Sequence, residues 1–75
     1  MSTGRVKVVF RESIDLPTVN MFATVLEVFG SLYRTQTAPR AIVVMPSDER
    51  TARDLQLQLA EWEKEGVLES WSHAT

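Results

Sequence analysis

The stretch Leu16–Tyr33, LPTVNMFATVLEVFGSLY, carries the pattern that decides the predicted fold. Its only charged residue is Glu27, and on a helix its apolar side chains would spread over about 180° of the circumference. A helix that packs on one side of a small domain needs an apolar stripe of about 100°. We therefore predict one helix over 16–33, whose surplus apolar surface contacts a second protein chain.

The predicted helix divides its apolar side chains between the domain core and a contact surface. Val19, Phe22 and Leu26 are assigned to the core flank. Gly30 is unfavourable inside a helix by up to about 1 kcal/mol relative to alanine, which indicates either an early helix end or a close helix contact. The predicted interface combines the other flank with one leucine and one tryptophan from later elements: Met21, Val25, Val28, Leu32, Leu57 and Trp71.

Length and composition limit how this chain reaches stability. Its 75 residues allow one domain, 1–75, and a chain of this size buries only about 60% of its unfolded surface. Cysteine is absent, which removes disulfides and most structural zinc sites. Association with another chain remains as a source of stability. The sequence shows no signal-peptide pattern and no apolar run of membrane-spanning length, so we expect a cytoplasmic protein.

Alternating side chains predict the first strand. In the segment 5–12, Val6, Val8 and Phe10 fall on one face, and the opposite face carries Arg5, Lys7, Val9 and Arg11. Such alternation is typical of a half-buried strand with one open face. Both helices should then cover the same side of the sheet.

The remaining elements follow from capping residues and apolar runs. Asp15 is a candidate N-cap of the first helix, and Ser47 of a second helix that ends at Gly66. The second helix carries a narrow apolar stripe: Ala52, Leu55, Leu59 and Trp62. Between the helices, the continuous apolar run 41–45 predicts a strand that is central or covered on both faces. The segment 67–73 alternates and suits a short edge strand.

The order of these elements predicts the fold class. Strands separated by helices imply right-handed crossovers and parallel pairing. We therefore expect an α/β protein, a small two-layer βαβα(β) sandwich with a mainly parallel sheet and two helices.

Four acidic residues follow the first two predicted strands: Glu12, Asp15, Asp48 and Glu49. The carboxyl ends of neighbouring parallel strands meet at one edge, where α/β proteins place ligands, and carboxylates there would suit Mg²⁺. Helix capping explains three of the four without a metal. A metal- or ligand-responsive regulatory domain is therefore an alternative function, and we assign no metal and no cofactor.

Arg5, Lys7 and Arg11 form the candidate contact for nucleic acid. A basic sheet face binds single strands when aromatic side chains interleave for stacking, but Val9 stands where an aromatic would be needed. Basic residues on an exposed strand also protect it from edge-to-edge pairing. Nucleic-acid binding is therefore the lesser alternative.

Motifs for catalysis are absent from the sequence. The turns between strand and helix contain no glycine, and neither the P-loop nor the dinucleotide fingerprint is present. His73 is the single histidine and lies near the C-terminus. We therefore predict a non-enzymatic interaction or oligomerisation module, which acts as a homo-oligomer or an adaptor and does not bind membranes.

Overall fold

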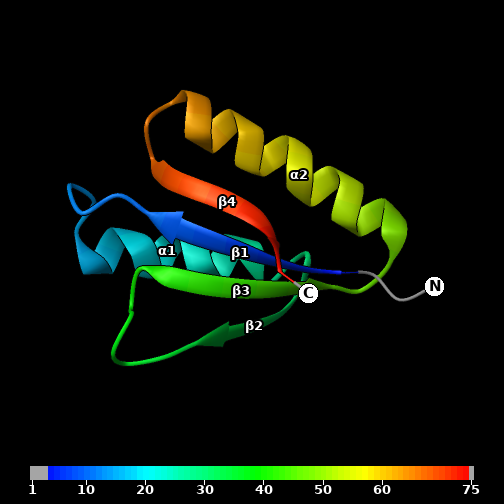
Figure 1. The fold of residues 1–75 in the computed structure, drawn as a ribbon, viewed down its shortest axis with the longest axis horizontal. Helices are drawn as coiled ribbons and strands as arrows, with labels where there is room; N and C mark the ends of the chain where they lie inside the picture. Colours follow the sequence, from blue (N-terminus) through cyan, green and yellow to red (C-terminus); the bar gives the residue numbers. More distant parts are fainter. Residues whose placement is uncertain (1–3, 75) are drawn as a thin grey trace.

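The computed structural model describes residues 4–74, which form four strands and two helices in the order βαββαβ (Figure 1). The strands are β1 (Arg5–Phe10), β2 (Gly30–Arg34), β3 (Ala41–Pro46) and β4 (Leu68–Ala74). The helices are α1 (Leu16–Leu26) and α2 (Glu49–Lys64). No helix within residues 4–74 is long and apolar enough to cross a membrane.

All four strands form one antiparallel sheet in the order β2-β3-β1-β4, so the predicted mainly parallel sheet is wrong. The error comes from the unpredicted strand β2. Because β2 follows α1 and turns back into β3, the direction of β3 is reversed, and β3 pairs antiparallel with β1. The resulting arrangement is the split βαβ, or ferredoxin-like, motif.

The helix predicted over 16–33 ends at Leu26, and its last third is a turn followed by β2. A hydrogen bond of 2.9 Å from the Phe29 N–H to the Leu26 carbonyl tightens this end of the helix. All residues of β2 then pair with β3, starting with Gly30 opposite Pro46. The early helix end is therefore the correct explanation of Gly30, and the close neighbour of this glycine is a strand.

The helices cover one face of the sheet and leave the other open. On β1 and β3 the buried side chains alternate, with Val6, Val8 and Phe10 facing the same side as Ile42 and Val44. The buried residues of α1 and α2 belong to the same cluster, so both helices lie on that side. This confirms the alternation predicted for the first strand, and β3 is central with neighbours on both sides.

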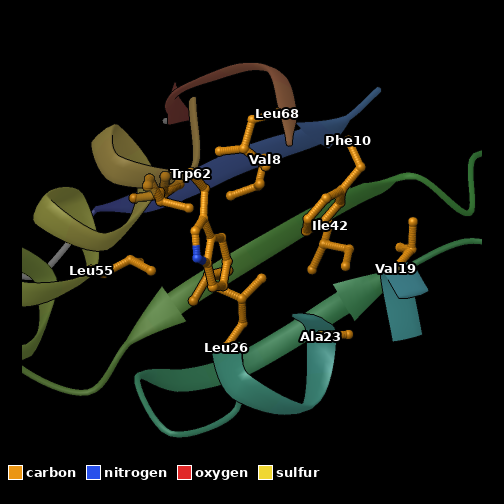
Figure 2. Packing of buried hydrophobic residues seen from close by; sticks show 12 residues of the cluster. Val8, Phe10, Val19, Ala23, Leu26, Ile42, Leu55, Trp62 and Leu68 are labelled. Carbon is orange, nitrogen blue, oxygen red and sulfur yellow. The ribbon is translucent and has the colours of Figure 1, made fainter. Parts of the chain in front are cut away.

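The core lies between the helices and the sheet (Figure 2). Three aromatic rings join its two helices to β1: the Phe22 ring lies 5.6 Å from that of Phe10 and 4.7 Å from that of Trp62, measured between centroids. Edge-to-face and offset pairs of this kind add about 0.5–1.5 kcal/mol beyond the burial of their area. Phe22 therefore links α1 to α2 as well as to the sheet.

Capping residues set the helix ends. Asp15 accepts a hydrogen bond from the Thr18 N–H and caps α1, as predicted. Asp48 caps α2 through the Thr51 N–H, so the predicted cap at Ser47 is one residue early. Gly66 follows α2 with φ of +83°, the left-handed conformation expected of a C′ glycine. The predicted third strand is present as β4, at the edge of the sheet.

Candidate association surface

The outer side of α1 exposes large apolar side chains. Met21 is 70% exposed, Val25 is 45% exposed, and Val28, in the turn after the helix, is 81% exposed. We call these three side chains the α1 surface. The sequence predicts all three on the contact flank, and in the structure all three are exposed.

The α1 surface lies opposite the side of the helix that enters the core. At 100° per residue its two helical members, Met21 and Val25, lie about 40° apart, and the buried set is centred about 150° away. That buried set is Val19, Ala23 and Leu26. The helix is therefore apolar on two nearly opposite sides, which explains the wide apolar arc seen in the sequence.

One polar side chain beside the α1 surface already has a hydrogen-bond partner within the helix. The hydroxyl of Thr24 donates a hydrogen bond of 3.1 Å to the Asn20 carbonyl, one turn earlier. Because this bond gives the hydroxyl proton an acceptor within the helix, Thr24 can lie at an interface without a hydrogen-bond acceptor from the partner chain. The outer side of α1 is thus uncharged and only weakly polar.

The charge content of the two helices differs sharply. The eleven residues of α1 include no charged side chain. The sixteen residues of α2 include seven: Glu49, Arg50, Arg53, Asp54, Glu61, Glu63 and Lys64. Charged residues are depleted at the centres of protein interfaces, and methionine is enriched there. The solvent-facing side of α1 therefore resembles an interface, whereas that of α2 resembles an ordinary surface.

The other predicted interface residues do not join the α1 surface. Leu32 lies on β2 opposite Val44 and packs against the core. Trp71 lies on β4 opposite Val8, on the helix side, and also packs against the core. Leu57 is 68% exposed on α2, but charged residues precede and follow it by one turn, and an isolated exposed leucine is common.

The four acids of the alternative metal site are not brought together. Glu12 and Asp15 follow β1, whereas Asp48 and Glu49 follow β3, and these two strands run in opposite directions. The two pairs therefore lie at opposite ends of strands about 20 Å long. Within residues 4–74, no group of three or more histidine or acidic side chains is arranged to hold a metal ion.

Hydrogen bonds at the helix caps lower the pKa of two of these acids. The pKa of Asp15 lies below its ordinary value because Thr18 donates side-chain and backbone hydrogen bonds to the carboxylate. Asp48 has a lowered pKa for the same reason, with the Thr51 backbone as the main donor. Both carboxylates thus serve the helix ends, in agreement with the capping explanation.

The three basic residues of the predicted nucleic-acid contact separate into two groups. Arg5 and Lys7 are exposed on the open face of β1. Arg11 lies beyond the end of β1, where its Nε donates a 3.3 Å hydrogen bond to the Leu68 carbonyl. The guanidinium of Arg11 therefore helps to hold β4 in place and is partly committed to that contact.

The open sheet face carries a hollow that the sequence patterns do not predict. It has a volume of about 220 Å³, and its lining includes Lys7 from β1 together with Tyr33 and Arg34 from β2. Tyr33 is 58% exposed. The sequence placed Tyr33 in a helix, and only the pairing of β2 with β3 reveals that it shares a sheet with Lys7.

Comparison with family models, curated proteins and solved structures gives no match for this chain. Function must therefore be argued from the surfaces themselves, since the ferredoxin-like arrangement supports many unrelated activities.

Proposed function

We propose that this domain is a non-enzymatic association module that acts by binding a second protein chain through the α1 surface. The observation that carries the proposal is a helix of eleven residues without charge, which exposes Met21 and Val25 and is followed by the exposed Val28. Spacings of four and three residues match the anchors of helices that dock apolar surfaces. The cytoplasmic location expected from the sequence is part of the same proposal.

A second copy of this chain is the first partner to test. In a two-fold contact the same patch lies on both sides of the interface. Its three apolar side chains bring no like charges together, and the exposed Glu27 beside Val28 borders the patch. From Met21 to Val28 the footprint is about 11 Å long and 10 Å wide. Stable complexes bury about 800 Å² per partner, so self-association through this patch alone should be weak, with Kd well above 1 µM.

Light scattering coupled to size-exclusion chromatography, and sedimentation velocity, test self-association over 10 µM to 1 mM. We expect the average mass to rise with concentration for the wild type. Val28→Glu should stay monomeric with an unchanged melting temperature at low concentration, because its side chain is exposed. Leu57→Glu is the matched control, since it adds the same charge at a similarly exposed apolar residue on α2 and should associate like the wild type.

A strict monomer at 1 mM would exclude self-association through α1. The adaptor form of the proposal is then tested by affinity capture, with the wild type, Val28→Glu and Leu57→Glu as parallel baits. A protein held by the wild type and by Leu57→Glu, but lost with Val28→Glu, would support docking on α1. Equal capture by all three baits would refute it.

A further inference from the structure

The hollow on the open sheet face combines an aromatic ring, a lysine and an apolar floor. Along one row of the sheet, Tyr33 lies opposite Val43, and Val43 lies opposite Lys7. Thr35 borders the hollow at the β2 edge, and Ala41 extends its floor beside Val43. Arg34 also borders it, but Arg34 pairs with the buried Ile42, so its side chain leaves the sheet on the helix side. Neighbouring strands are about 4.8 Å apart, so the ring of Tyr33 and the ammonium of Lys7 stand on either side of this floor.

Charge is segregated on the open face. Within residues 4–74, no acidic side chain lines the hollow, although the chain as a whole has a net charge of −2. Arg5 continues the basic character along β1. The acids of this face, Glu12 and Glu69, border a neighbouring hollow, where Arg40 accompanies them. An anionic ligand is therefore favoured only on the side of Lys7 and Tyr33.

From this arrangement we infer that the open face binds single-stranded nucleic acid, with one base stacked on Tyr33 and phosphates contacted by Lys7 and Arg5. Stacking on exposed aromatics and a basic track along the backbone are the two elements that such binding requires. The hollow is smaller than the roughly 300 Å³ at which drug-sized pockets begin, which suits one base. Arg5 places a second cation beyond the hollow. A nucleic-acid strand would bring a further phosphate to this cation, whereas a free nucleotide would not reach it.

This site is independent of the proposed association surface. The α1 surface belongs to the helix layer, whereas the hollow lies on the opposite face of the sheet. The aromatic that the first strand lacks at Val9 is supplied by β2. Substitutions in one surface can therefore be tested without disturbing the other.

Fluorescence anisotropy with labelled octamers of thymidylate and uridylate, in 50 mM NaCl, tests the inference. Two phosphate contacts on a single strand predict that log K falls with log salt concentration with a slope of about −1.4, and that Lys7→Ala reduces the slope by about 0.7. Tyr33→Leu should weaken binding by about 5- to 150-fold, whereas Tyr33→Phe should bind like the wild type because the ring is kept. Lys64→Ala removes the same charge from the last turn of α2 and should change nothing.

Three results would overturn the inference. The first is the absence of binding at 200 µM protein in 50 mM NaCl. The second is binding that Tyr33→Leu does not weaken, with heparin binding equally well, which would show a general polyanion surface. The third is uridine monophosphate binding as tightly as the octamer, which would assign the hollow to a free nucleotide. Thermal melts of each variant establish that the fold is retained.

Discussion

Replacing Gly30 with alanine separates the observed fold from the helix predicted over the same residues. Inside a helix, this change would stabilise the protein by about 1 kcal/mol. On backbone entropy alone, the change would also favour a strand by about 0.5–1 kcal/mol. Both simple expectations therefore have the same sign, and only the packing of β2 against β3 predicts the opposite result.

The contact geometry gives the magnitude. A Cβ on Gly30 would collide with the carbonyl oxygen of Met45, and it would lie 2.8 Å from the Met45 carbonyl carbon and 2.9 Å from Cα of Pro46. These are backbone atoms of β3, which cannot rotate away as a side chain does. Overpacking costs about 1–3 kcal/mol, and the entropy gain offsets part of it. We expect Gly30→Ala to lower the free energy of unfolding by about 1–2 kcal/mol.

Urea unfolding followed by circular dichroism measures this loss, with melting temperature as a second readout. One kcal/mol corresponds to about 4–8 °C in a domain of this size. Gly4→Ala is the control, because a Cβ there meets nothing within 4 Å, and it should stay within about 0.5 kcal/mol of the wild type. A Gly30→Ala variant that is as stable as the wild type, or more stable, would refute the pairing of β2 with β3 at this residue.

Three further predictions follow from the helix ends and the core. Gly66→Ala should lower the free energy of unfolding by about 1 kcal/mol in urea titrations, because φ of +83° strains any residue with a Cβ. Gly66→Asn should lower the free energy of unfolding by less, since asparagine tolerates this conformation. The pKa of Asp48 is lowered from 3.8 in the fold, so its contribution to stability is present above about pH 4 and is lost as pH falls through the lowered value. Asp48→Asn should therefore flatten the fall in melting temperature below pH 4. A fall in melting temperature like that of the wild type would contradict the capping assignment. Phe22→Glu should unfold the chain, whereas Val28→Glu should not, as circular dichroism will show; similar melting of both variants would mean that Val28 is part of the core.

Sequence reasoning succeeded where one periodicity dominated. The strict alternation around Val6 and Val8 identified β1 and its open face, and the narrow stripe through Leu55 and Leu59 identified α2. These patterns fit only one kind of element. The left-handed glycine after α2 was likewise predictable, because few residues adopt that conformation.

The same reasoning failed where two periodicities coincide. In the last part of 16–33, Leu32 and Tyr33 continue the apolar arc of a helix, yet they also alternate across a strand. The choice depends on β3, whose unsatisfied edge pairs with β2 from Gly30 to Arg34. No local pattern contains that information. Because β2 was not predicted, β3 received the wrong direction and Leu32 was assigned to the interface, whereas in the structure Leu32 packs against the core.

The two proposed surfaces lead to a joint expectation, because they lie on opposite layers of the domain. A dimer formed through α1 would place its two open sheet faces outward, so a long single strand could contact both basic tracks. Linking two sites in this way raises the apparent affinity through effective concentration, provided that the strand spans them. Val28→Glu should therefore weaken the binding of a long strand while leaving that of an octamer unchanged. Equal effects on both lengths would indicate that the glutamate acts on the nucleic-acid site itself, and that the two surfaces are not independent.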